Sequence, residues 1–211
     1  MRDAFGIKAG YTARGLPVYA DDPVDSAFQP DVYTLAGGLA TMLQASRIID
    51  IGCGSAAKLL PLASLCPLIG VDYGLNLSSL RARAPAHDWR ECDLESVGLT
   101  LLTTEEVTNA VVICADVIEH LVNPQPLLSA LCTWVGYAHC AVLSTPDRDS
   151  FYPATHFGPP ENPAHVREWS RVELVDYLEA GGCDVVFSGL TRSHTTQPCQ
   201  TTIALIRRRS T

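Results

Sequence analysis

Apolar residues follow two different spacings along the chain, and these predict alternating helices and strands. After Pro30 the spacing is that of an amphipathic helix, with apolar residues at Val32, Leu35, Ala36, Leu39, Ala40 and Leu43. Short runs rich in apolar residues then predict strands at 47–51, 68–72, 88–93, 110–116 and 138–145. Helices are expected between them at 56–65, from Asn76 and from Asn123-Pro124, with each asparagine placed to cap its helix. Strands that alternate with helices predict a parallel sheet covered on both faces.

The C-terminal part of the chain departs from this alternation. Ser170 and Glu173 have the spacing of a capping box for a helix that runs to Ala180 and is stopped by Gly181-Gly182. Two strand-like runs, CDVVFSGL and QTTIALIRR, then follow with no helix between them, so they are expected to pair antiparallel. We therefore expect one α/β domain with a mixed sheet over residues 30–211, preceded by an irregular lead-in or lid over residues 1–29.

Charge and composition disfavour several classes of protein. The net charge of −8 at pH 7 argues against binding to nucleic acid through phosphate contacts. No apolar run approaches the length of a membrane span, and the N-terminal residues lack the apolar core of a signal peptide. The eight cysteines form no CxxC pair, and those in apolar runs, such as Cys53, Cys114 and Cys140, are expected to be reduced. These features predict a soluble cytoplasmic protein and do not indicate its oligomeric state.

A turn with small residues follows the first predicted strand. In IIDIGCGSAA, Gly52, Gly54 and Ala56 form a G-x-G-x-A pattern between a strand and a helix, where a ligand can rest on the backbone. Asp72 ends the second strand, where a carboxylate can accept two ribose hydroxyls. This context fits a nicotinamide, a flavin or S-adenosylmethionine. The alternative is a tight turn with an unrelated surface aspartate.

Two other carboxylates bear on that choice. Asp50 lies two positions before the first glycine, where it would suit a cationic amino acid or a sulfonium and would repel a pyrophosphate. Asp93 follows the third strand, where it could bond the exocyclic amine of an adenine or act as a turn cap. The pair favours S-adenosylmethionine.

The motifs IIDIGCGSA, GVDYG, CDLES, ICADVIEHL and LSTPDRD, in this order, resemble those of the class I S-adenosylmethionine-dependent methyltransferases. The resemblance covers residues 30–207 and implies a Rossmann-like, mostly parallel seven-stranded sheet with an antiparallel last strand and helices on both faces. It also implies a set of cofactor-binding residues. These are Asp50, Gly52 and Gly54 for the methionine part, Asp72 for the ribose, Asp93 and Leu94 for the adenine, and Ala56, Tyr73 and Asp116 as further cofactor-binding residues.

An acid–histidine step follows the fourth predicted strand. In ADVIEHL, the residues Asp116, Glu119 and His120 would project from nearly one face of a helical turn. The step resembles that of ubiquinone-pathway O-methyltransferases. Small-RNA 2′-O-methyltransferases pair a similar step with a later His-x-x-Glu-Trp, which here begins at His165. This resemblance implies a divalent metal such as Mg²⁺ on Asp116, Glu119, His120 and His165, although Asp116 stands where those branches have glutamate.

The same residues also suit a reaction without a metal. A hydroxyl acceptor ionises too little at neutral pH, so a base must take its proton as the methyl arrives. His120 and His165 are the candidate bases because imidazole titrates near neutral pH, and Glu119 completes the predicted catalytic group.

Residues 145–169 form a long stretch for which we predict no regular element and a role as acceptor wall and lid. The string from STPDRD to GLTRS resembles bacterial methyltransferases associated with the assembly of glycans or glycosylated metabolites. We therefore expect O-methylation of a small molecule or saccharide, with no nucleic-acid or membrane partner. The alternatives are N-methylation of a small amine, RNA 2′-O-methylation, which the acidic charge disfavours, and a cofactor-binding module without catalysis.

Overall fold

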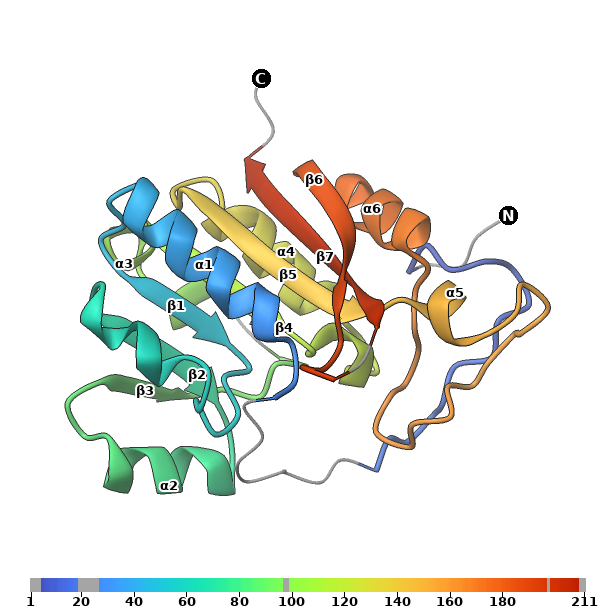
Figure 1. Ribbon diagram of the computed structural model, residues 1–211, viewed down its shortest axis with the longest axis horizontal. Coiled ribbons are helices and arrows are strands. Elements are labelled where there is room, and N and C mark those ends of the chain that lie inside the picture. Colours follow the sequence, from blue (N-terminus) through green and yellow to red (C-terminus); the bar gives the residue numbers. More distant parts are fainter. Residues whose placement is uncertain (1–4, 19–26, 97–98, 197, 209–211) are drawn as a thin grey trace.

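Seven strands form one mixed sheet in the order β3-β2-β1-β4-β5-β7-β6 (Figure 1). The computed structural model describes residues 5–18, 27–96, 99–196 and 198–208. The strands are β1 (Ile48–Ile51), β2 (Leu68–Asp72), β3 (Asp88–Glu91), β4 (Val111–Ala115), β5 (Cys140–Pro146), β6 (Cys183–Arg192) and β7 (Cys199–Arg208). β1 to β5 pair in parallel, whereas β7 pairs antiparallel with both β5 and β6. The predicted Rossmann-like seven-stranded sheet is confirmed.

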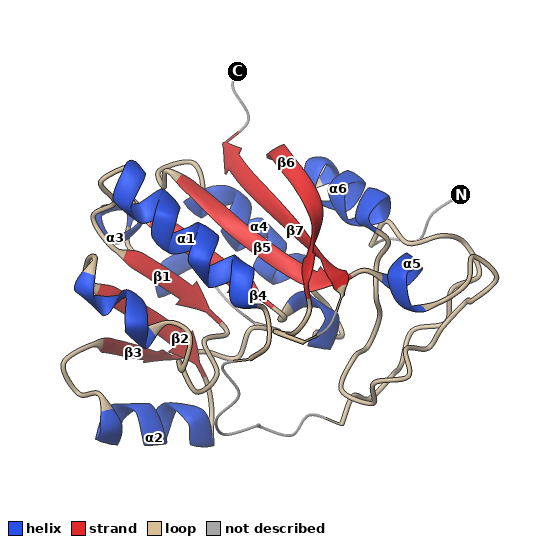
Figure 2. Cartoon of the chain, in the orientation of Figure 1, coloured by secondary structure: helices blue, strands red, loops and turns tan. Residues whose placement is uncertain are grey.

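Helices cover both faces of this sheet (Figure 2). The α-helices are α1 (Pro30–Met42), α2 (Leu75–Arg83), α3 (Thr104–Val107), α4 (Gln125–Trp134), α5 (Arg148–Phe151) and α6 (Arg171–Ala180), and the 3-10 turns are η1 (Leu60–Ser64), η2 (Leu99–Leu101) and η3 (Ile118–His120). Buried residues of α1 and α2 belong to the apolar core on one face, and those of α4 and α6 belong to the core on the other. None of the helices in the described ranges has the length and apolarity needed to cross a bilayer.

Strand β1, in the interior of the sheet, divides its side chains between the two cores. Ile48 packs with α1, whereas Ile49 and Ile51 pack on the opposite face, and all three are fully buried. Full burial of such a side chain stabilises the fold by about 1.5–3 kcal/mol. Because side chains alternate along a strand, Asp50 must face α1, where Tyr33 meets it.

Two of the predicted helix starts are wrong. The helix expected at 56–65 is reduced to η1, and Ala56 itself has a left-handed backbone (φ 53°) that a right-handed helix cannot include. Asn76 does not cap α2, which already begins at Leu75 after Gly74. The helix expected after Asn123-Pro124 is confirmed as α4, but it begins at Gln125 with Pro124 at the N-cap position, and Asn123 precedes the cap, where its Oδ1 accepts the N–H of Gln125 at 3.2 Å.

The C-terminal predictions agree better with the structure. Ser170 and Glu173 form the expected capping box, with distances of 3.3 and 3.0 Å between side chain and backbone nitrogen, and α6 ends at Ala180. The stretch 145–169 is less irregular than predicted, because β5 extends to Pro146 and the short helix α5 follows.

One pair of cysteines contradicts the expectation of reduced thiols. Cys132 in α4 and Cys183 at the start of β6 form a disulfide, with their Cα atoms 5.3 Å apart. Nothing in the spacing of the cysteines indicates this pair, because 51 positions separate the two residues and only the tertiary fold brings them together. Cys53, Cys114 and Cys140 are free and buried, as predicted.

The described part of the N-terminal segment runs beside the loop that leaves α5 (Figure 1). The N–H groups of Thr12, Arg14 and Val18 donate to the carbonyls of Phe157, Val166 and Pro163, at 2.8, 2.8 and 2.9 Å. Residues 5–18 and 157–166 thus form one layer at the carboxyl edge of the sheet. The proposed lead-in or lid over residues 1–29 lies partly outside the described residues.

Candidate active site

In the turn after β1, the backbone is covered by a neighbouring side chain at Gly52 and uncovered at Gly54. Gly52 has φ 77°, and a Cβ there would collide with Cγ2 of Val117. Gly54 has φ 53°, and a Cβ there would meet no atom within 4 Å. Gly52 is therefore required for packing, whereas Gly54 faces open space that a ligand can fill.

The carboxylate of Asp72 links this turn to the end of β2. Its Oδ2 accepts the N–H of Gly54 at 2.6 Å, and its Oδ1 accepts the N–H of Tyr73 at 2.8 Å. Each carboxylate oxygen retains acceptor capacity, so Asp72 can also receive hydroxyl donors.

Asp50 lies beneath the turn, out of contact with solvent. It is fully buried, and its Oδ2 accepts the hydroxyl of Tyr33 at 2.9 Å. Burial raises the pKa of this carboxyl to about 7, while the Tyr33 hydrogen bond and the charge of Lys58 act in the opposite direction. Its Oδ1 has no partner among the described residues. A cation placed near this carboxylate would stabilise its ionised form.

One cleft of about 700 Å³ connects the glycine turn to the predicted histidines. Gly52, Gly54 and Ser55 line it from the turn, and Asp116, His120 and His165 line it from the segments after β4 and α5. These groups meet because β1 and β4 are neighbours in the sheet although β2 and β3 come between them in the chain. The carboxyl edge at such a reversal of strand order is where open α/β sheets bind ligands.

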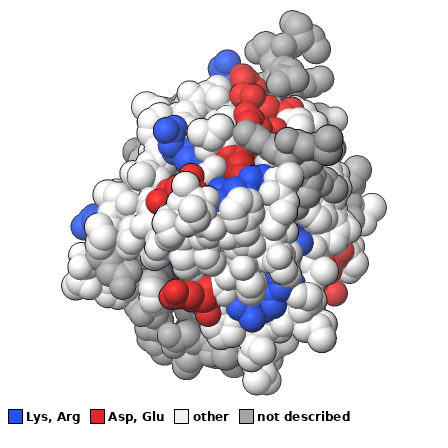
Figure 3. All heavy atoms as spheres, turned by 90° about the vertical axis from the view of Figure 1, so that its right-hand side faces the viewer, with Lys and Arg blue, Asp and Glu red and all other residues white. Residues whose placement is uncertain are grey.

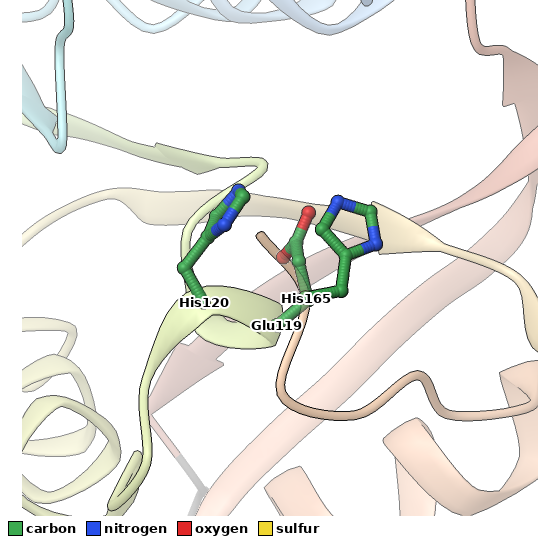
Figure 4. A group of neighbouring side chains, drawn as sticks. All are labelled: Glu119, His120 and His165. Atoms are coloured by element: carbon green, nitrogen blue, oxygen red, sulfur yellow. The ribbon is translucent and has the colours of Figure 1, made fainter. Parts of the chain in front are cut away.

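Glu119, His120 and His165 form a compact cluster at this cleft, which the two histidines line (Figure 4). One potential ligand atom of each lies within 4.8 Å of the others, and the two imidazole rings meet edge to face with centroids 4.9 Å apart. Glu119 is fully buried; its Oε2 accepts the hydroxyl of Thr145 at 2.9 Å, and its Oε1 has no partner among the described residues. The cluster combines η3 with the loop at 164–167, which the N–H of Val166 joins to the carbonyl of Glu119 at 2.7 Å.

Each imidazole is oriented by an acceptor at its Nδ1. His120 Nδ1 lies 2.9 Å from the carbonyl of Ala164, and His165 Nδ1 lies 2.5 Å from Oε1 of Glu168. Both contacts require a proton on Nδ1, which leaves the lone pair on Nε2. Burial and the neighbouring His165 lower the pKa of His120 to about 4, so this ring is neutral at neutral pH.

Asp116 is outside this cluster, contrary to the prediction that it joins the metal ligands. Its backbone is left-handed (φ 54°) and precedes η3, so Asp116 is not part of the same helical turn as Glu119 and His120, although its carboxyl group hydrogen-bonds to that of Glu119. Its Oδ1 also accepts the Nε2–H of Gln29 at 2.5 Å. Burial raises the pKa of Asp116, and burial together with the nearby Asp116 charge raises that of Glu119.

A family model described as a methyltransferase domain matches residues 28–187, which is most of the chain. The chain belongs to the class I S-adenosylmethionine-dependent methyltransferase family. The match includes the glycine turn, Asp72, the acid–histidine step and His165.

Known proteins agree with this assignment. A probable S-adenosylmethionine-dependent methyltransferase of Mycolicibacterium smegmatis is 30% identical over 140 residues, which are 65% of this chain and 52% of that protein. The chain therefore spans about half the length of this relative. Among solved structures, the CcbJ methyltransferase from Streptomyces caelestis has a TM-score of 0.66 at 16% identity, covering 94% of this chain and 99% of that one. Magnesium protoporphyrin IX methyltransferase from Synechocystis PCC 6803, solved with bound SAH (S-adenosylhomocysteine, the demethylated cofactor), has a TM-score of 0.59 at 17% identity. The match covers 86% of this chain and 83% of that one. These two likenesses concern the fold.

The residues of the turn fit the cofactor of the family, but not every predicted contact lines the cleft. Gly54 offers uncovered backbone, and the unpartnered Asp50 oxygen offers a site for positive charge. Six of the predicted cofactor residues are outside the described lining of the cleft: Asp50, Ala56, Asp72, Tyr73, Asp93 and Leu94. Asp93 Oδ1 accepts the N–H of Glu95 at 3.0 Å, so Asp93 caps a turn, which was the alternative to its role at the adenine.

Several residues of the cleft were not found from the sequence. They are Gln29, Tyr33, Lys58, Ser193 and Thr201. Tyr33 lies among the apolar positions of the first predicted helix and could have been suspected from the buried acid beneath it. Gln29, Ser193 and Thr201 stand in no motif, because hydrogen bonds in the folded chain bring them together from the start of α1, the end of β6 and β7.

Proposed function

We propose that this protein transfers the methyl group of S-adenosylmethionine to a hydroxyl group of a small molecule or saccharide. One observation supports this most: the uncovered turn at Gly54 and the imidazoles of His120 and His165 line the same cleft. A donor on the turn and an acceptor beside the imidazoles would share one enclosed space, and such alignment supplies much of the rate of a bimolecular transfer.

The chain would bind the cofactor along the carboxyl edge of the sheet. S-adenosylmethionine supplies an electrophilic methyl group. Asp50, Gly52, Gly54 and Ala56 would hold its methionine part, Asp72 and Tyr73 its ribose, and Asp93 and Leu94 its adenine. Ionised Asp50 would attract the positive charge of the donor, and the product, which lacks the sulfonium charge, would lose part of that attraction.

His165 is the residue we assign to proton removal. Glu168 fixes the proton of this ring on Nδ1, and Nε2 accepts the side-chain amide of Asn162 at 2.9 Å. The amide orientation of Asn162 is set by its Oδ1, which accepts the N–H of Ala164 at 3.0 Å. An acceptor hydroxyl that replaced this amide would give its proton to Nε2 as its oxygen bonds to the methyl carbon. The C–S bond would break with its electron pair left on sulfur.

The unpartnered Oε1 of Glu119 favours a second role for the cluster, as the site of a divalent cation. Glu119, His120 and His165 would hold it, because two imidazoles oriented through their Nδ1 atoms and one carboxylate are a typical donor set. When bound, such a cation lowers the pKa of a hydroxyl on it.

A small acceptor fits the charge of the molecule better than a nucleic acid does. The net charge is −8, and on the face in Figure 3 the described basic side chains are interspersed with acidic ones. Nucleic-acid binding normally needs a gathered basic surface.

The direct test combines cofactor binding with transfer to two kinds of acceptor. We expect SAH to bind in calorimetry and methyl transfer to occur to hydroxyl compounds, with His165→Ala reducing transfer by about 10²–10⁴-fold and leaving SAH affinity unchanged. Methyl transfer to amines, together with no transfer to hydroxyl compounds, would support the N-methyltransferase alternative. Binding of SAH without transfer to any acceptor would support the module without catalysis.

A further inference from the structure

Gln29 connects three distant segments at the wall of the cleft. Its side-chain nitrogen donates to Oδ1 of Asp116 at 2.5 Å and to the hydroxyl of Thr201 at 3.2 Å. The Thr201 hydroxyl in turn donates to Oγ of Ser193 at 3.0 Å. The backbone N–H of Gln29 also donates to the carbonyl of Ser193 at 3.0 Å. All four residues line the cleft.

The amide of Gln29 can point in one direction only. Its nitrogen must face the Asp116 carboxylate, because two acceptor oxygens at that distance would repel each other. Both amide protons are then used on Asp116 and Thr201, and the carbonyl Oε1 has no partner among the described residues. Gln29 is 2% exposed, and a buried acceptor without a donor costs about 1–3 kcal/mol. The structure thus retains, at considerable cost, an amide oxygen suited to a hydroxyl donor.

The charges around Gln29 disfavour an ionised acceptor. Of the described residues that line the cleft, Lys58 alone is a Lys or Arg, whereas Asp116, Glu161 and Glu168 are acidic. An anionic acceptor would be repelled by this excess of carboxylates. A cationic acceptor would find Asp116 already bonded to Gln29 and Oε1 of Glu168 already bonded to His165.

Aromatic side chains supply the apolar part of the same cleft. Phe28, Phe151 and Tyr152 line it, and the first two are 42% and 44% exposed. Apolar surface with a few fixed polar groups is typical of small-molecule sites. A ring with C–H faces and a rim of hydroxyls matches both parts of this lining.

We propose that Gln29, backed by Thr201 and Ser193, is the acceptor-specificity residue, and that it accepts a hydrogen bond from a hydroxyl of an uncharged, polyhydroxylated ring. This inference rests on the proposed hydroxyl methyltransferase function and narrows its acceptor class. Gln29 itself takes no part in proton removal.

The test measures acceptor binding directly, by NMR titration of the SAH-saturated protein. The probes are three compounds with the same ring: methyl glucopyranoside, its 2-amino analogue and its 6-carboxylate analogue, which are neutral, cationic and anionic. We expect the neutral glycoside to bind and the charged analogues to bind at least tenfold more weakly. Gln29→Ala should weaken binding of the neutral glycoside about tenfold. Thr201→Val should weaken that binding less, because this substitution removes only a hydrogen-bond partner of the Gln29 amide.

Gln44→Ala is the matched control. Gln44 has the same left-handed backbone as Gln29 (φ 52° in both) but is exposed at the other end of α1, so the variant controls for backbone relaxation. We expect it to bind all probes and SAH as the wild type does. SAH affinity of Gln29→Ala should also stay within about twofold of wild type.

The outcomes separate this inference from the proposed function. Absence of neutral-glycoside binding, tighter binding of the amino analogue, or an equal loss of SAH affinity in Gln29→Ala would each overturn the inference. Hydroxyl methylation that is unaffected by Gln29→Ala would overturn it while leaving the proposed function intact. Glycoside binding that depends on Gln29, without any methyl transfer, would contradict the proposed function alone.

Discussion

Oε1 of Glu168 lies 2.5 Å from Nδ1 of His165, and both side chains are almost completely buried, at 4% and 11% exposed. Three residues apart in the chain, they form a pair in which the carboxylate can hold only the tautomer with its proton on Nδ1. Glu168 is therefore a positioning residue, because it acts on the acceptor only through the imidazole.

The first prediction concerns this pair. Glu168→Ala should lower kcat about 10–100-fold with little change in SAH affinity, because the ring loses its orientation. Glu168→Gln should lose less, since its amide oxygen still accepts from Nδ1. Glu161→Gln is the control, because Glu161 lines the cleft on the same loop but is exposed. Equal losses in the Glu161 and Glu168 variants would contradict the assignment.

The two glycines of the turn should respond differently to alanine. Gly52→Ala should unfold the protein or strongly destabilise it, because the new methyl collides with Val117. Gly54→Ala should fold with a cost of about 1 kcal/mol, since Ala56 already occupies the same backbone region (both φ 53°) in this turn. Its methyl would fill the space proposed for the cofactor, so SAH affinity should fall at least tenfold. Thermal unfolding and calorimetry of both variants test this, and a Gly54→Ala protein with normal SAH affinity would place the cofactor elsewhere.

The buried carboxyl of Asp50 should make stability depend on pH. Burial raises its pKa from 3.8 to about 7, so the folded state binds this proton more tightly than the unfolded state does. The contribution of Asp50 to the free energy of unfolding is then largest below about pH 4, falls as pH rises to about 7, and is constant above. Relative to wild type, Asp50→Asn should gain stability across this window, by up to about 4 kcal/mol.

Urea unfolding of the cofactor-free protein at pH 5 and pH 7.5 measures this difference. Asp184→Asn serves as control because Asp184 pairs with Arg207 at an exposed site. A stability difference between Asp50→Asn and wild type that does not change with pH would show that Asp50 is ionised throughout.

The cluster of Glu119, His120 and His165 predicts a measurable affinity for a divalent cation. After dialysis against a chelator, Mn²⁺ or Mg²⁺ should raise the melting temperature of the wild type, because a ligand that binds only the folded state stabilises it. Glu119→Gln should abolish this shift. Activity that persists in the chelator and is lost only in His165→Ala would instead support proton removal by the imidazole alone.

The disulfide between Cys132 and Cys183 should contribute strongly to stability. It closes a loop with a sequence separation of 51, for which the chain-entropy model gives about 4 kcal/mol. Reductant should lower the free energy of unfolding of the wild type by a few kcal/mol. It should lower that of the control variant Cys199→Ala by the same amount, since Cys199 is free and exposed. Eight titratable thiols in the native protein without reductant would contradict the pairing.

The spacing of residues was sufficient to predict the sheet, the antiparallel end and the cofactor turn. Apolar periodicity reflects which face of an element is buried, and that is a local property. The capping box at Ser170 and Glu173 and the turn at Gly52 and Gly54 were predicted for the same reason. The helix expected at 56–65 failed because nothing local indicates the left-handed backbone of Ala56.

The cluster and the wall of the cleft depended on tertiary structure. The sequence placed Asp116 with Glu119 and His120, but the backbone of Asp116 turns its carboxylate toward Gln29. The approach of His165 to His120, of Thr201 to Gln29 and of Cys132 to Cys183 joins residues 45, 172 and 51 positions apart. The sequence by itself determined which elements form and where a cofactor can rest on bare backbone, because these follow from local patterns. Only the packed sheet decided which side chains face each other across the cleft, because the order and register of the strands set those distances.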